Sequence, residues 1–441
     1  MHKRHSLINI LGTPTSVGDP AGPLVKHHLV LTDEYCGIPW YNARDNTVER
    51  EAVKKLLVDS MMWGSNIEIF IDARRCPTFG DQLMDKMMKI LPPTQDDEDD
   101  DDDDETVVSQ EGARKSTFLR ELNLWDASMK RPTPPRAQRV TDRGLQRLDA
   151  PNMRIFMLAG HHWLTPSVVV TCVSKMRYLT TLSVRGMSRL SSKHVKKIVE
   201  SSPALISLDL YGVFQLTDKV LDTISSSRGD QLTSLDLSHC TRLSLLALRE
   251  AALRLTKLKR LGLAGLTFVD DGCVRDFVTT AARGHREEPS GIASGIASGI
   301  ASGIRTRSGR DSGWKLRPIN LARAKRRSAA AAESGGLADT DSPGLHTLDL
   351  SSTSITDRGL VFVEEFCTKT IHELSCRRCA GVSDMGVAIV SQCPLLFKLD
   401  LSFCDCITTP TAWGPYEIET CRAFLYEDDM LWRSQEEAIE K

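Results

Sequence analysis

Apolar side chains recur along this chain in a fixed order: one apolar residue, two variable residues, a second apolar residue, one variable residue and a third apolar residue. The order is plain in 232–237, 345–350 and 396–401. Alternation over so short a stretch predicts a strand with one buried face. Residues such as Val387 and Val390 follow at the spacing of a helix that has one apolar stripe. Each copy therefore predicts a short strand followed by a helix.

The middle apolar residue of each copy serves as a marker of the repeat length. Most successive markers lie 25 to 27 residues apart, and three wider gaps of 51, 34 and 87 residues each equal one repeat plus an insertion. This length is typical of leucine-rich repeats, in which stacked units share one core. The sequence predicts an α/β fold, a leucine-rich repeat solenoid (horseshoe) with short parallel strands on the concave face and helices on the convex face. The ten markers are Ile71, Leu122, Phe156, Leu182, Leu208, Leu235, Leu261, Leu348, Leu374 and Leu399.

Composition divides the chain into repeats, caps and insertions. Ten consecutive carboxylates from Asp96 to Glu105 repel one another and predict disorder. The longer insertion repeats Ser-Gly-Ile-Ala, typical of a flexible linker, and then carries nine Arg or Lys between Arg305 and Arg327. We expect the following segments: a cap or tail at 1–64, a first repeat at 65–91, the acidic insertion at 92–117, repeats at 118–284, the second insertion at 285–343, repeats at 344–410 and a cap or tail at 411–441.

The basic half of the second insertion supports three interpretations. It is a solvated tether, a nuclear import signal around Arg323–Arg327, or an electrostatic partner for the acidic run or for nucleic acid. For the whole chain, the net charge of −2 gives no reason to expect a polyanion as partner. No apolar run approaches the roughly 18 residues of a membrane span, so no membrane association is expected. Twelve cysteines without an export signal are read as reduced thiols, which predicts a cytoplasmic or nuclear location, or both.

Several cysteines occupy a position fixed by the repeat, five residues after the marker. A small, weakly polar side chain suits this turn, where it is buried near backbone groups. The crowding of cysteines in the last two repeats also suggests a zinc site. Separate repeat positions explain these cysteines more simply, so no metal and no cofactor are expected. The cysteines at the repeat-fixed position are Cys76, Cys240, Cys379 and Cys404, and those that complete the crowded group are Cys376, Cys393 and Cys406.

These repeats resemble a known family. Leu-Asp-Leu-Ser-x-Cys at 235–240 and 399–404, together with Ile-Thr-Asp-Arg-Gly-Leu at 355–360, is similar to the cysteine-containing leucine-rich repeats of F-box/LRR proteins and of the antagonist-of-mitotic-exit-network group. The resemblance implies a horseshoe that holds a protein substrate, beside an F-box that docks on Skp1 of a cullin ubiquitin ligase. The F-box itself is not detected, since residues 1–64 lack its Leu-Pro start and its Cys-x-x-Trp-like end.

Outward positions on the predicted strands define a candidate partner surface. Its row contains Asn123, Ser183, Asp209, Asp236, Gly262, Asp349, Ser375 and Asp400, whose aspartates we interpret as ordinary solvated carboxylates. Aromatic and arginine side chains dominate binding hot spots, so the flanking residues are the better candidates. The predicted partner-binding residues are Trp125, Arg185, Tyr211, Arg377 and Lys398.

No catalytic motif is recognisable, and His161-His162 is interpreted as a pair of turn histidines, so no enzyme and no catalytic residue are predicted. The first hypothesis is a non-catalytic scaffold that recognises substrates for an SCF-type ubiquitin ligase, with a protein substrate on the concave face and Skp1 and cullin as further partners. The alternative is a ligase-independent nuclear or signalling scaffold. A nucleic-acid-associated factor that uses the basic insertion is the least favoured.

Overall fold

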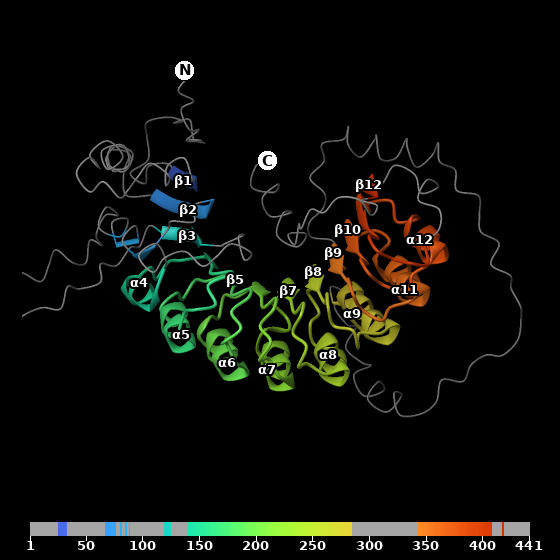
Figure 1. Cartoon of the computed structure of the whole chain (residues 1–441), viewed down its shortest axis with the longest axis horizontal. Coiled ribbons are helices and arrows are strands. Elements are labelled where there is room, and N and C mark those ends of the chain that lie inside the picture. Colours follow the sequence, from blue (N-terminus) through green and yellow to red (C-terminus); the bar gives the residue numbers. More distant parts are fainter. Residues whose placement is uncertain are drawn as a thin grey trace, which may run out of the picture. The chain divides into compact units, whose positions relative to one another are not determined.

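The structure, a computed structural model, contains two compact units (Figure 1). The first comprises residues 1–251 and 262–266, and the second comprises residues 252–261 and 267–441. The structure describes residues 25–32, 67–75, 80–81, 84–85, 88, 119–124, 140–284, 343–407 and 417–418.

Parallel strands in chain order form the sheet of the first unit. The sequence markers pair directly across it: Ile71 with Leu122, Leu122 with Phe156, and so on to Leu208 with Leu235. This register confirms the predicted repeats, because a slip of one residue would turn the buried leucines to the other face. The strands are β1 (Val25–Thr32), β2 (Ile67–Arg75), β3 (Leu119–Asn123), β4 (Ile155–Met157), β5 (Thr181–Ser183), β6 (Ser207–Asp209) and β7 (Ser234–Asp236).

Helices follow the strands of the first unit and lie along one side of its sheet (Figure 1). In α6, Val195, Ile198 and Val199 form the buried stripe that the spacing predicts. The helices are α4 (Asp142–Arg147), α5 (Pro166–Ser174), α6 (Ser192–Ser201), α7 (Asp218–Arg228) and α8 (Leu245–Ala252), of which the last residue falls in the second unit.

The second unit repeats the same strand and helix order. Leu348, Leu374 and Leu399 pair in register, and Leu399 also pairs with Ile418. Its elements are β8 (Arg260–Gly262, whose last residue belongs to the first unit), α9 (Asp271–Arg283), β9 (Thr347–Asp349), α11 (Asp357–Cys367), β10 (Glu373–Ser375), α12 (Asp384–Val390), β11 (Lys398–Asp400) and β12 (Glu417–Ile418).

The long insertion interrupts the chain but not the stacking of the second unit. The amides of His346 and Thr347 donate to the carbonyl of Lys259, over 2.7 and 3.1 Å, and α9 packs against α11. The repeat before the insertion therefore stacks directly on the repeat after it. This arrangement explains why the marker spacing of 87 residues counts as a single structural step.

Each unit has a core formed by the marker residues and the helix stripes. Leu122, Phe156, Leu182 and Leu374 are completely buried. Neither the strand nor the helix of one repeat can bury its apolar face alone, so the core exists only in the stack. The predicted α/β leucine-rich repeat solenoid is confirmed by the parallel strands, their register and the helices that follow them.

An aspartate clamp links several helix starts to the start of the following helix. The first helical residue is an aspartate in several repeats, and its carboxylate accepts hydrogen bonds from the amide and hydroxyl of the Thr or Ser that caps the following helix. In the pair Asp271–Thr356 these distances are 2.8 and 2.7 Å. The clamp satisfies donors at a helix start and ties repeats together. The pairs are Asp81–Thr141, Asp142–Thr165, Asp218–Ser244, Asp271–Thr356 and Asp357–Ser383.

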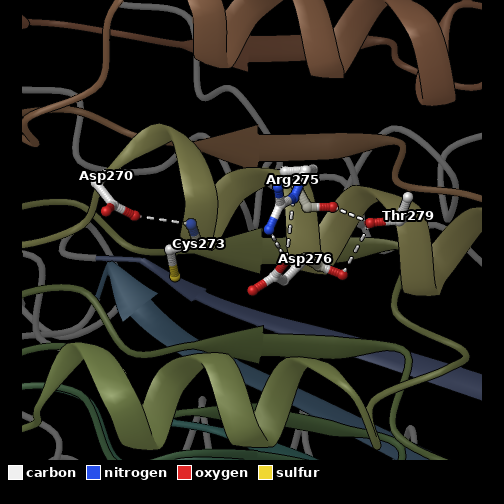
Figure 2. A network of polar contacts seen from close by, with 5 residues as sticks. All are labelled: Asp270, Cys273, Arg275, Asp276 and Thr279. Carbon is white, nitrogen blue, oxygen red and sulfur yellow. Dashed lines mark hydrogen bonds and ion pairs between the residues drawn. The ribbon is translucent and has the colours of Figure 1, made fainter. Parts of the chain in front are cut away.

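Helix α9 shows how these starts are capped (Figure 2). The carboxylate of Asp270 accepts a hydrogen bond of 2.8 Å from the amide of Cys273. One turn later Arg275 forms an ion pair of 3.0 Å with Asp276, and the hydroxyl of Thr279 donates to the carbonyl of Arg275. These contacts are local to the helix, so they stabilise its first turns without offering a ligand site.

Some predictions concern segments outside the described residues. They include the acidic run from Asp96 to Glu105 and nearly all of the second insertion at 285–343. Strands β1 and β12 add pairing within the segments expected to be caps or tails. Across the described ranges, no helix combines the length and apolar character that crossing a membrane requires.

Candidate protein-interaction surface at the strand exits

Each turn that leaves a strand from β4 to β11 has a residue in the left-handed region, four positions after the marker. Its amide donates to a carbonyl of the next repeat, as from Gly186 to Tyr211 (2.7 Å) and from Arg378 to Ser402 (2.9 Å). Glycine suits such a φ because it has no Cβ. The residues at this position are Gly160, Gly186, Gly212, His239 and Gly265 in the first unit, and Ser352, Arg378 and Phe403 in the second.

Aspartates at the strand ends support the same turns. Asp209 Oδ1 accepts from the amide of Tyr211 over 3.0 Å, and Asp236 Oδ1 accepts from the amide of Ser238 over 2.8 Å. Only 1% of Asp209 and 3% of Asp236 is exposed. The interpretation of Asp209 and Asp236 as solvated carboxylates was wrong. The turn buries them, and they accept hydrogen bonds from turn amides.

One group of polar and aromatic side chains lies at the exits of β5, β6 and β7, in the first unit. The guanidinium of Arg185 stacks 3.8 Å from the centre of the Tyr211 ring, which meets the His239 ring edge-on at 4.9 Å. Arg185 is only 4% exposed, and Asp209 lies among the charges near it. The sequence prediction placed Arg185 and Tyr211 on one face, and the structure brings the two into contact.

The carboxyl group of Asp209 is electrostatically unusual. Burial, reinforced by the neighbouring Asp236 carboxylate, raises the pKa of Asp209 to about 6, against opposing effects from Arg185 and from hydrogen bonds. The hydroxyl of Ser183 donates to Asp209 Oδ2 over 2.7 Å. The two aspartates are therefore held close together by the turn geometry despite their like charge.

A second group lies at the exits of β10 and β11 in the second unit. Arg377 and Arg378 hold their guanidinium groups 4.9 and 5.1 Å from the centre of the Phe403 ring. Phe403 is 46% exposed and has a φ of 62°. A bulky side chain in the left-handed region is strained, and such strain is kept where the surroundings or a function require it. We name these three residues the exit cluster.

The remaining predicted residues have different positions. Trp125 lies outside the described residues, and Lys398 is half-buried on β11 opposite Glu373 of β10. The partner-binding role of all five residues stays a prediction. Sequence reasoning missed His239, Arg378 and Phe403, although a signal was available, since each replaces the glycine that other repeats carry four residues after the marker.

The repeat cysteines form a ladder of thiol donors. The Sγ atoms of Cys240, Cys379 and Cys404 donate to the carbonyl oxygens of the preceding repeat, to Leu210, Leu350 and Cys376 at 3.2, 3.1 and 2.9 Å. Burial raises the pKa of the Cys404 thiol to about 11 and also raises that of Cys379. The predicted structural role of Cys240, Cys379 and Cys404 is confirmed, and Cys76 lies outside the described residues.

Metal and catalytic chemistry find no support in these groups. Within the described ranges, no three His, Cys, Asp or Glu side chains gather in a way that could hold a metal ion. The rings of His161 and His162 lie 3.1 and 3.2 Å, by their Nδ1 atoms, from the carbonyl oxygens of Ala159 and Gly160. They are the turn histidines that the sequence predicted.

Comparison with known proteins adds one family match. A family model described as "Leucine Rich repeat" matches residues 342–363, which contain β9 and the first part of α11. This match falls on a repeat whose register continues through both neighbouring strands. The chain therefore has the fold of a leucine-rich repeat solenoid, and this one repeat matches the family model. The matched repeat has the same strand, exit turn and capped helix as the other described repeats.

Three similar solved structures are each less than 15% identical to this chain. The complex of Rad7 and Elc1 from yeast is 12% identical, with a TM-score of 0.37, and the similarity covers 84% of this chain and 92% of that chain. The tropomodulin C-terminal domain of Caenorhabditis elegans is 13% identical, with a TM-score of 0.27 over 32% and 90% of the two chains. A complex of TLR13 with single-stranded RNA is 14% identical, with a TM-score of 0.30 over 68% and 45%. No curated protein matches the sequence.

Proposed function

We propose that this leucine-rich repeat protein is a non-catalytic adaptor that binds a protein partner at its strand exits. The observation that carries the proposal is the exit cluster. Phe403 is partly exposed beside two guanidinium groups, in a backbone conformation that favours glycine. A ring placed so adds little to the core, whereas aromatic and arginine side chains supply much of the energy of protein interfaces.

We further propose that the partner is a substrate of an SCF-type ubiquitin ligase. The support is the resemblance of the cysteine repeats to those of F-box/LRR proteins. The thiols of Cys240, Cys379 and Cys404 strengthen it, because each donates a hydrogen bond to a carbonyl of the preceding repeat. In this role the chain presents a substrate in the cytoplasm or nucleus and performs no chemistry itself. The ligase part rests on analogy between repeats.

Affinity purification of the full-length chain from its native cells tests both parts. We expect mass spectrometry to detect Skp1 and a cullin together with at least one further protein. The further protein should be lost from the Phe403→Gly variant, whereas Skp1 and the cullin should remain. A parallel chain that lacks residues 1–64 shows whether Skp1 binding depends on that segment.

Partners recovered without Skp1 or cullin would refute the ligase role and leave the alternative, a ligase-independent nuclear or signalling scaffold. Retention of the same further protein by Phe403→Gly at wild-type yield would refute the assignment of the binding site. Arg358→Gln is a suitable control for both parts, because Arg358 is an exposed arginine of α11 in the same unit.

A further inference from the structure

The three described exit turns of the second unit differ from most turns of the first. After β4, β5 and β6 the left-handed position holds glycine, whereas after β9, β10 and β11 it holds Ser352, Arg378 and Phe403. Glycine would adopt this backbone conformation without strain. The last two of these turns instead carry a long cation and a large ring. Residues other than glycine at these strained positions favour a role for their side chains in binding, not in folding.

The two arginines of the exit cluster are available for a ligand. Among the described residues neither forms an ion pair, and Arg377 Nε is buried without a hydrogen-bond partner. Both guanidinium groups lie over the Phe403 ring, an arrangement that holds an arginine in place without using its N–H groups. Guanidinium groups bind carboxylates through two parallel, charge-assisted hydrogen bonds.

We propose that the exit cluster of Arg377, Arg378 and Phe403 is a docking site for an acidic segment of a protein partner, with carboxylates on the two arginines and an apolar side chain on the exposed ring. This inference rests on the proposed function as a protein-binding adaptor and names the chemistry of its partner. The ring offers an apolar surface beside two cations, and a peptide with alternating acidic and apolar residues complements both.

Nucleic acid fits the same residues less well. Single-stranded nucleic acid is bound by a cationic groove and by successive aromatic platforms. The described part of these turns offers two arginines and one ring, and Asp400 and the exposed Asp405 lie in the same repeat as Phe403. Their negative charges disfavour a continuous phosphate backbone. An acidic peptide needs to place only two carboxylates near the arginines.

Fluorescence anisotropy with the full-length protein tests the proposal. The probe is a fluorescein-labelled nine-residue peptide in which Asp or Glu alternates with Leu, and its analogue carries Asn and Gln in place of the acidic residues. We expect a dissociation constant in the micromolar range for the acidic probe and at least tenfold weaker binding of the neutral one. Arg377→Gln, Arg378→Gln and Phe403→Gly should each weaken binding about tenfold or more, the equivalent of one charge-assisted contact.

The control variant is Arg358→Gln, which removes an arginine stacked 6.0 Å from the ring of Phe362 on α11. It should change the affinity less than twofold. Phe403→Gly should keep a thermal midpoint equal to or above that of the wild type, because glycine relieves the left-handed strain. Loss of binding together with preserved stability separates a docking residue from a structural one.

Three outcomes would overturn the proposal. They are no binding of the acidic probe, equal binding by the wild type and the three cluster variants, or tighter binding of a fluorescein-labelled 15-residue oligo(dT) through the same residues. The readout is independent of the ligase hypothesis. If the probe binds but cells yield no Skp1, the docking site stands and the ligase role falls. If Skp1 is recovered but the probe does not bind, the reverse holds.

Discussion

The aspartate clamp allows a quantitative prediction at the step from α11 to α12. Asp357 Oδ1 accepts hydrogen bonds from the amides of Ser383 (2.8 Å) and Gly386 (3.1 Å), and its Oδ2 accepts one from the Ser383 hydroxyl (2.6 Å). Replacement of Asp357 by Ala removes all three. A hydrogen bond contributes about 1 kcal/mol net, and the acidic residue in the first turn of α11 contributes about 0.5 kcal/mol more through the helix dipole. We expect Asp357→Ala to cost about 3.5 kcal/mol.

Gly386 supplies a sharper test of the same geometry. A Cβ at this position would collide with Asp357 Oδ1 and lie 2.8 Å from a methyl group of Leu360. Alanine normally stabilises a helix relative to glycine by about 1 kcal/mol, but here we expect Gly386→Ala to destabilise. In an Asp357→Ala background the collision with the carboxylate is gone. The cost of Gly386→Ala should therefore shrink by roughly 1 to 2 kcal/mol, a coupling of the size measured between contacting residues.

Urea denaturation of the full-length wild type, both single variants and the double variant measures the coupling. Amide hydrogen exchange at Ser383 and Gly386 locates it, since these two donors lose their acceptor in Asp357→Ala. Additive costs of the two substitutions would contradict the clamp. A cost of Asp357→Ala below about 0.5 kcal/mol, within the range of ordinary surface substitutions, would show that the clamp does not stabilise the stack.

Three further predictions concern buried polar groups. Because the pKa of Asp209 is raised to about 6, its contribution to stability is fully present below about pH 4 and is lost as the pH rises through 6. Asp209→Asn should remove this pH dependence in urea titrations from pH 4 to 7. An unchanged pH profile of the variant would contradict the prediction. Cys379→Ala should cost about 1 to 3 kcal/mol because it removes a buried side chain and one of two donors to the Leu350 carbonyl, the other being the Thr353 hydroxyl at 2.6 Å. Cys379→Ser should cost less, and the exposed Cys406→Ala should change the midpoint little. Equal costs of Ala and Ser would refute the thiol bond. In the native protein a thiol reagent should modify the exposed Cys406 well before Cys379, whose thiol is buried and has a raised pKa. Mass spectrometry of the labelled peptides measures the order. Modification of Cys379 first would contradict the burial of the thiol ladder.

The clamp and the thiol ladder were partly visible in the sequence. Asp357 and Asp384 recur at one repeat position, and Cys379 and Cys404 at another, so a structural role could be predicted for both sets. The partner of each group could not be predicted. Asp357 bonds to Ser383, 26 residues away, and Cys404 to the carbonyl of Cys376, 28 residues away, and such contacts depend on how closely neighbouring repeats approach.

The sequence by itself determined the repeat, its length and its strand register. Ile71, Leu122 and Leu399 could be aligned from their spacing alone, because the period of apolar residues dictates which face of a strand is buried. Only the tertiary structure decided what the outward positions do. It buried Asp209 beneath an exit turn and placed Phe403 beside two arginines, since a left-handed turn redirects side chains in a way that alternation along a strand does not reveal.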